Sequence, residues 1–233
     1  MRMLKRLVIA LVALAVLVVG GTYVYIHFIK DEAPAKLTLE SGSTDSTTAS
    51  TTASTTAADT SDPSGTWTAG AGSQAGYRVK EVLFGQSTSA VGRTSDVTGQ
   101  LVIDGTTVSS TKIVVDMTTV KSDEDRRDGQ FQGRVMDTAT YPTATFELTT
   151  PIDLGALPAA GATVTKQATG KLTLRGTTKE VTVDLTARRT AGKIEVQGSI
   201  PIVFADWSIP NPSLGPANTE DHGELEFLVA FTR

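Results

Sequence analysis

The sequence predicts an all-β domain over residues 66–233, with about eight antiparallel strands and one short helix. From Trp67 onward, segments of 6–12 residues alternate apolar and polar side chains, which is typical of strands buried on one face. Gly or Pro separates the segments, and short turns join neighbours, so sequential strands should pair antiparallel. Such a set forms a sandwich or a closed barrel, and closure removes the edge strands that an exterior domain must protect.

The individual strands follow from this alternation. In the first half of the domain, strands are expected at 77–84, 97–104, 111–120 and 143–149. In the second half, alternation indicates strands around 172–175, 181–188, 194–204 and 225–231. Turns at 175–178 and 191–192 then make two hairpins.

One segment, 123–136, has a helical pattern. Ser122 or Asp123 can cap it, and the acidic residues that follow suit the positive end of a helix. Phe131 and Val135 lie four residues apart and therefore share a face. Two glycines weaken the segment, so the helix must lean on tertiary contacts.

The N-terminal part predicts a membrane anchor. Residues 7–29 carry no acidic, Lys or Arg side chain, and as a helix these 23 residues reach about 35 Å, enough to cross a bilayer core. A cleaved secretory signal is the alternative, but the apolar run is long for one. The basic residues of the tip favour a cytoplasmic N-terminus. We therefore expect residues 1–30 to be a cytoplasmic tip with a single-pass signal-anchor helix, and the C-terminal domain to be extracytoplasmic at the cell membrane, in a bacterial cell envelope.

Residues 31–65 form the predicted linker. Between 41 and 60, 13 residues are Ser or Thr, and the rest are Ala, Asp or Gly. Such a tract buries too little apolar surface to offset its ordering entropy, so a disordered tether is expected.

Composition excludes several classes of function. The chain has no cysteine, so thiol catalysis and thiolate metal sites are excluded. Charges in the domain are near balance without a basic stripe, which argues against nucleic acid. His222 is the only histidine of the domain, so neither a triad nor a histidine metal site is expected. The carboxylates at 123, 125, 128 and 137 are interpreted as a solvated helix face. We expect no metal, no cofactor and no catalysis.

Parity along the strands selects the side chains that face the barrel interior. These candidates for ligand binding are Phe146, Leu148, Leu172, Leu174, Val183, Leu185, Val196, Phe204, Phe227 and Val229. Phe131, Val135 and Trp207 are candidates for closing one end. Small barrels either fill their interior or keep a cavity for one ligand, and the alternation does not separate these cases.

Two motifs, in order and at matching spacing, carry a resemblance to the YceI-like family. The first is Arg127-Asp128 with Phe131, followed by Tyr-Pro-Thr-Ala-Thr-Phe at 141–146. The second is the hairpin at 170–181, and a weaker match lies at 204–209. The resemblance implies a lipocalin-like antiparallel barrel with a long pocket for polyisoprenoid or similar amphipathic chains. The family's early histidine and an aromatic pair near 135–136 are missing here, which puts the shape of the pocket entrance in doubt.

The main hypothesis is therefore a membrane-tethered protein that holds or carries an isoprenoid-type or other long-chain amphipathic lipid. A second hypothesis is a structural or signalling barrel with a filled core, which recognises a protein partner through the loop at 210–223. A third is an enzyme acting on lipid or quinone. It would need an interior acid–base group, but parity directs Asp184 and Glu226 to the outside.

Overall fold

The structure is a computed structural model that describes residues 5–6, 14, 16, 20–21, 33–39, 62–83, 85–190, 192–213, 215 and 217–233. Its elements, in chain order, are β1 (Gly65–Ala69), β2 (Gln74–Leu83), β3 (Gln86–Thr94), β4 (Val97–Asp104), β5 (Thr107–Asp116), η3 (Met117–Thr119), β6 (Lys121–Ser122), α2 (Asp125–Gln130), η4 (Phe131–Val135), β7 (Thr143–Leu148), β8 (Ile152–Asp153), β9 (Thr163–Leu174), β10 (Thr177–Thr190), β11 (Lys193–Val203), η5 (Phe204–Trp207), β12 (Ala217–Thr219) and β13 (His222–Thr232).

Eight of these strands close into a barrel. The ring runs β1, β4, β5, β7, β9, β10, β11 and β13, and β13 pairs with β1 to complete it. Every pair in the ring is antiparallel. The prediction of an antiparallel, eight-stranded, closed barrel is confirmed, and the sandwich alternative is not what forms.

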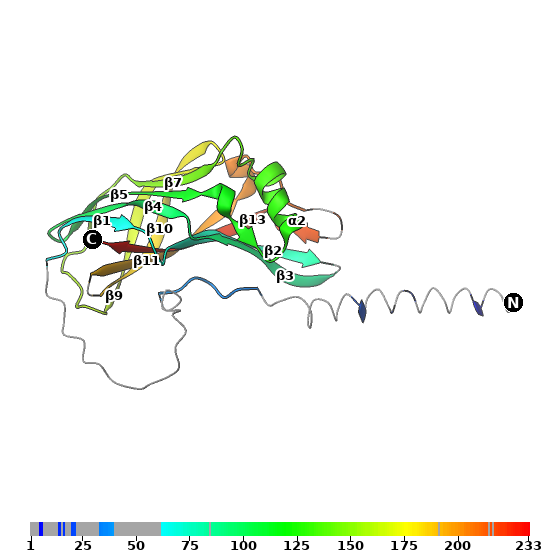
Figure 1. The fold of residues 1–233 in the computed structure, drawn as a ribbon, viewed down its shortest axis with the longest axis horizontal. Coiled ribbons are helices and arrows are strands. Elements are labelled where there is room, and N and C mark those ends of the chain that lie inside the picture. Colours follow the sequence, from blue (N-terminus) through cyan, green and yellow to red (C-terminus); the bar gives the residue numbers. More distant parts are fainter. Residues whose placement is uncertain are drawn as a thin grey trace, which may run out of the picture.

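The barrel is extended beyond the ring at one end. The last residues of β13 pair with β1, whereas its earlier part, Glu224–Leu228, pairs with β2. From there β3 and β6 continue the sheet. Figure 1 shows α2 at this end of the barrel, opposite the end where β1 and the C-terminus lie. We call it the helix end, and the other the β1 end.

The predicted helix forms over a shorter span than expected. α2 continues directly into a single π-helical turn, η4, so residues 125–135 are helical. The predicted cap at Ser122 or Asp123 is wrong, because Glu124 caps the helix through the Arg126 N–H. Ser122 instead pairs with Gly92 in β6, and its N–H and hydroxyl donate to the Asp128 carboxylate at 2.8 and 2.7 Å.

Five strands were not predicted: the short β1, β6, β8 and β12, and the longer β3. β3, Gln86–Thr94, pairs with β2 over nine residues, but six of its nine residues are Ser, Thr, Ala or Gly, and Val91 is its one large apolar side chain. Its pattern therefore lacks the contrast on which alternation depends. In addition, Phe204 was expected at the end of a strand and begins the 3₁₀ helix η5 instead.

The predicted membrane anchor at 7–29 lies outside the described residues, apart from a few scattered positions. In the part of the chain that the structure describes, no helix is both long and apolar enough to span a bilayer. The anchor and the boundaries 1–30, 31–65 and 66–233 therefore stay predictions.

A short piece of the predicted linker has a defined place. Residues 33–39, which we call the strap, lie along the outside of the barrel, and their two leucines pack with Leu228 of β13. Leu37, Leu39 and Leu228 are 4 %, 7 % and 2 % exposed. Figure 1 shows the strap as the blue segment beneath the barrel.

Candidate functional site

The barrel interior is not filled by side chains. An inner chamber of about 180 Å³ and a mouth chamber of about 500 Å³ follow one another inside it. They share four lining residues, Ala75, Val115, Ala144 and Leu225, which form a waist between them. The larger volume lies within the range of about 300–1,000 Å³ that is usual for ligand pockets. The tunnel thus runs lengthwise through the barrel and is suited to a long, narrow guest.

The inner chamber is almost wholly apolar. Its wall comes from alternate residues of β4, β5, β7, β9, β10, β11 and β13. Eight predicted ligand-binding residues lie here, namely Phe146, Leu148, Leu172, Val183, Leu185, Val196, Phe227 and Val229. Side-chain parity placed them correctly because successive residues of a strand face opposite sides of the sheet. Their role in binding stays a prediction.

Two glycines make room for the aromatic side chains of this wall. A Cβ at Gly170 would lie 2.5 Å from the ring of Phe146, and one at Gly198 would lie 2.6 Å from the ring of Phe227. Both distances are shorter than real Cβ contacts. The rings therefore pack against bare backbone, where a larger residue would collide with them.

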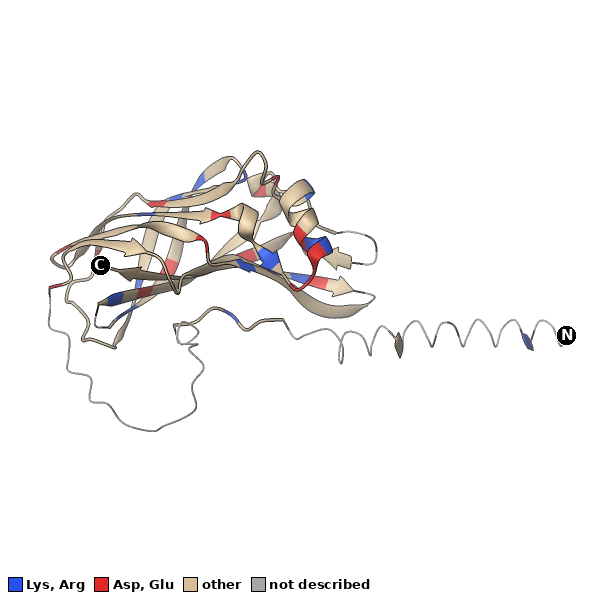
Figure 2. Ribbon diagram, in the orientation of Figure 1, with Lys and Arg blue, Asp and Glu red and all other residues tan. Residues whose placement is uncertain are grey.

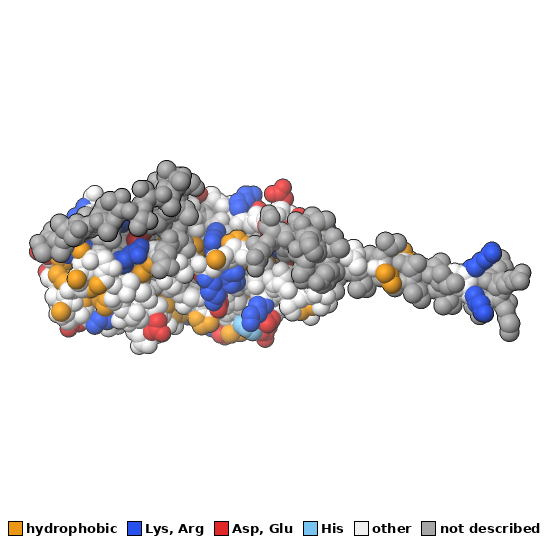
Figure 3. Space-filling view, turned by 90° about the horizontal axis from the view of Figure 1, so that it is seen from below, with side chains coloured by type: hydrophobic (Ala, Val, Ile, Leu, Met, Phe, Trp, Pro, Cys, Tyr) orange, Lys and Arg blue, Asp and Glu red, His pale blue; other side chains and the backbone are white. Residues whose placement is uncertain are grey.

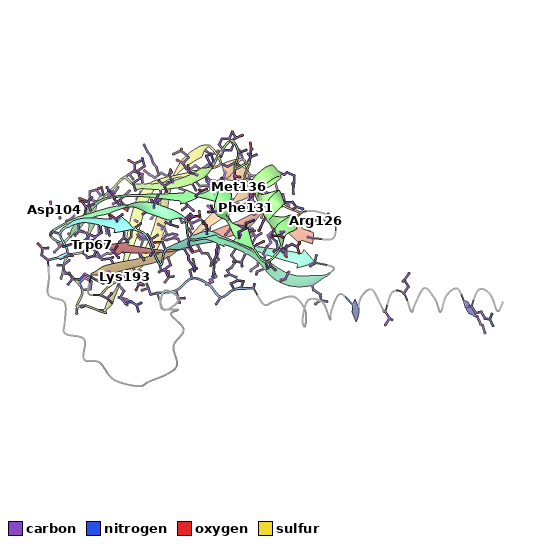
Figure 4. The ribbon with its side chains drawn as sticks, in the orientation of Figure 1. Trp67, Asp104, Arg126, Phe131, Met136 and Lys193 are labelled. Carbon is purple, nitrogen blue, oxygen red and sulfur yellow. The ribbon has the colours of Figure 1, made fainter. Side chains whose placement is uncertain are left out.

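The mouth chamber lies at the helix end and receives the remaining candidates, with one exception. Leu174, Phe204, Phe131 and Val135 line it. Trp207 instead packs in the core, and the ammonium of Lys179 lies 5.8 Å from its ring centroid. The exposed Arg126 on α2 also belongs to the lining, so the chamber reaches the surface there. In Figure 4, Phe131 and Met136 lie beside α2, with Arg126 on its outer side.

Charged side chains line both chambers: Lys166, Arg188 and Arg189 belong to the inner one, and a denser group of both signs lies at the mouth. The Arg127 guanidinium lies 3.2 Å from the Glu81 carboxylate and also pairs with Asp123. Burial disfavours its charge, but the two carboxylates outweigh burial and raise the pKa of Arg127. Glu81 is 6 % exposed although it lines the chamber. Figure 2 shows acidic and basic residues gathered on α2 and the adjoining strand ends.

Tyr77 also lines the mouth chamber, close to Arg127. Its ring stacks on Phe131, with the centroids 5.0 Å apart and the planes 18° from parallel. A Cβ at Gly92 would lie 2.4 Å from the tyrosine ring, so the facing strand offers the ring bare backbone. Desolvation by burial raises the pKa of Tyr77 well above its usual value, and the phenol stays neutral.

The predicted solvated face of α2 is wrong in one respect. Asp123 and Asp125 are exposed, but Asp128 is 4 % exposed and fixes the start of the helix to β6. Lys121 lies 3.5 Å from its second carboxylate oxygen. Among the described residues, no three His, Cys, Asp or Glu side chains gather as a metal site would require.

Sequence reasoning missed part of the wall. Val79, Met117, Met136, Ile113 and Val115 all line the tunnel. Four of them lie in segments that were expected as strands, Val79 in 77–84 and Ile113, Val115 and Met117 in 111–120, so the same parity could have found them. Met136 follows the helical turn η4, which no period-two pattern reaches.

Comparison with known proteins places this architecture. The YceI-like domain model matches residues 67–231. A polyisoprenoid-binding domain from Saccharophagus degradans, implicated in plant cell wall breakdown, is 21 % identical with a TM-score of 0.59, over 72 % of this chain and 97 % of that one. BcnA of Burkholderia cenocepacia is 21 % identical with a TM-score of 0.50, over 66 % and 95 %. A search of curated sequences gives no match.

At these identities the solved structures show a shared fold, whereas the family model covers most of the chain and nearly the whole barrel. The resemblance seen in the two sequence motifs is confirmed. The chain belongs to the YceI-like domain family.

Proposed function

We propose that this protein is a membrane-tethered, extracytoplasmic binding protein that holds a polyisoprenoid-type or similar long-chain amphipathic lipid in its barrel. The observation that carries the proposal is the tunnel, whose inner chamber has an almost wholly apolar surface and whose mouth is lined by charged side chains of both signs. The family and the name of the Saccharophagus degradans domain as polyisoprenoid-binding support a lipid ligand.

The apolar wall supplies the affinity in this proposal. Each CH₂ group that leaves water for an apolar wall contributes about 0.8 kcal/mol. A dozen such groups give on the order of 10 kcal/mol before the entropic cost of association. No catalytic side chain is required, because burial alone holds the tail.

The polar head belongs at the mouth. The Arg127 guanidinium is already paired with Glu81 and Asp123, so it shapes the entrance rather than offering a free charge. Arg126 lines the chamber, is exposed, and has no ion pair with any of the described residues. A weakly anionic or hydroxyl head is therefore the chemistry that fits this rim.

The cellular location follows from the N-terminal sequence. Residues 7–29 supply the anchor, and the basic residues before them keep the tip in the cytoplasm. The barrel then lies on the outer side, where a chain without cysteine folds without disulfides.

A plugging substitution tests the proposal. Ala144 is buried at the waist, and Thr143 on the same strand is exposed, so Ala144→Phe blocks the tunnel while Thr143→Phe adds the same ring outside. We expect organic extracts of the purified full chain and of Thr143→Phe to contain a stoichiometric lipid by mass spectrometry, and the Ala144→Phe extract to have lost it. Circular dichroism must show that both variants are folded. Lipid-free extracts of the unaltered chain, together with no uptake of added polyprenyl lipid, would contradict the proposal.

A further inference from the structure

The strap lies in a site that the barrel builds for it. Leu37 and Leu39 alternate with exposed neighbours, and their side chains bury against Leu228 on the outer face of β13. This face would otherwise carry an apolar residue into water. Figure 3 views the barrel from below, the side on which the strap lies, and shows Lys and Arg side chains in the middle of that side.

Three arginines hold the strap's backbone. Arg78 and Arg188 donate to the carbonyl oxygens of Pro34 and Leu39, each at 2.6 Å, and Arg93 donates to that of Ala35. Arginines that donate hydrogen bonds to carbonyl groups bind the backbone of a segment rather than its side chains.

Two buried carboxylates accept hydrogen bonds from those arginines and so hold the guanidinium groups toward the strap. Glu226 is 2 % exposed and accepts from Arg78 and Arg93, with the shortest contact at 2.7 Å from Arg93. Glu195 is 4 % exposed and accepts from Arg188 at 2.8 Å. Parity predicted that Glu226 points out of the barrel, and its burial there comes from the strap and the arginines around it.

The strap has a defined direction along the barrel. Lys36 pairs with Glu224, which lies near the start of β13 and lines the mouth chamber. Leu39 reaches Arg188, whose partner Glu195 lies opposite Ala230 near the end of β13. The strap therefore runs from the helix end toward the β1 end, and its first residue is directed toward the mouth.

We propose that the strap clamps the barrel with its mouth turned toward the membrane surface, so that lipid passes between bilayer and tunnel directly. This rests on the anchor at 7–29 in the proposed function. The four residue steps from 29 to the strap at 33 span at most about 14 Å, whereas the 36 steps from 29 to β1 at 65 could reach about 130 Å. The docked strap thus converts a long tether into a short one that leaves from the mouth side.

The rim of the mouth is compatible with a bilayer interface. Val82, near the end of β2, and Val203, at the end of β11, are 41 % and 47 % exposed, and both strand ends lie at the helix end. Arg126 of α2 is exposed at the same end, together with Asp123, Glu124 and Asp125 (Figure 1 and Figure 4). Exposed apolar side chains among charged ones of both signs suit the boundary between acyl chains and head groups.

Depth-dependent fluorescence quenching tests the orientation. Because the chain has no cysteine, Val82→Cys at the mouth and Ala156→Cys near the β1 end each give one exposed labelling site. The full chain, labelled with an environment-sensitive dye, is placed in phosphatidylcholine vesicles that contain lipids spin-labelled at the head group. We expect strong quenching at position 82 and little at position 156. Equal quenching at both positions, or an N-terminal segment removed from the mature protein, would overturn the proposal.

Variants that loosen the strap provide the second test of the orientation. Leu37→Ser with Leu39→Ser removes both buried contacts without altering the tunnel, and Thr38→Ser at the exposed position between them is the matched control. We expect the double variant to lose the difference between the two labels and the control to keep it. A double variant that keeps the difference would overturn the proposal. Bound lipid, measured in the same samples by mass spectrometry, reports on the proposed function separately, so a lipid-loaded barrel with random orientation contradicts only the orientation.

Discussion

The ion pairs of Glu226 with the arginines that hold the strap allow a quantitative test. The carboxylate oxygens of Glu226 accept four contacts from Arg78 and Arg93, at 3.4, 3.3, 3.2 and 2.7 Å, so only one has the length of a strong charge-assisted hydrogen bond. One such bond is worth about 1.5–3 kcal/mol. Removing the partner of a fully buried charge costs about 3–5 kcal/mol, but the two arginine side chains are 14 % and 22 % exposed and recover part of their hydration.

We therefore expect Glu226→Gln, which keeps the volume, to lower the free energy of unfolding by about 2–3 kcal/mol in urea denaturation followed by circular dichroism. Trypsin should then cleave after Lys36 sooner, because the arginines that hold the strap have lost their carboxylate. Glu147→Gln is the control, since Glu147 and Lys112 are each 63 % exposed and 3.9 Å apart, and such a pair contributes about 0–1 kcal/mol. If the two variants lost equal free energies of unfolding, the reasoning that burial decides how much an ion pair stabilises the fold would be refuted.

Three further expectations concern the barrel wall and its ionisable groups. Gly198→Val should lower the unfolding free energy by about 1–3 kcal/mol and reduce lipid content, because the new side chain meets Phe227; urea denaturation and extraction measure both. The hydrogen bond that the His222 ring donates to the Asp221 carboxylate raises the pKa of His222, so this contribution to stability is present below the unfolded-state pKa and lost as the pH rises through the folded value; an NMR titration of Asp221→Asn should show a lower pKa of His222. Burial raises the pKa of Tyr77, so an alkaline absorbance titration should show that this phenol ionises only when the barrel unfolds.

The sequence predicted the wall better than the space inside it. Alternation assigned Leu172, Val183 and Phe227 to the interior because a strand reverses its side chains at every residue. It failed for β3, whose small side chains give little contrast between faces. Whether the interior is hollow depends on side-chain sizes brought together by pairing, such as Gly198 beneath Phe227, and pairing partners are not visible along a single strand.

The ends of the barrel were predicted less well for a different reason. Ser122 has the right chemistry for a helix cap, but strand pairing with Gly92 and hydrogen bonds to Asp128 take it into β6. The strap did carry a signal, because Leu37 and Leu39 alternate with polar neighbours just before the Ser/Thr tract. That signal is only two residues long, and whether the two leucines are buried depends on the tertiary contacts that they make.

Native mass spectrometry of the full chain in mild detergent tests the central claim most directly. The account predicts a folded species that carries the mass of one long-chain lipid, retained in Thr143→Phe and absent from Ala144→Phe. A folded chain that shows only its own mass, and that still shows only its own mass after incubation with a polyprenyl lipid, would contradict the account.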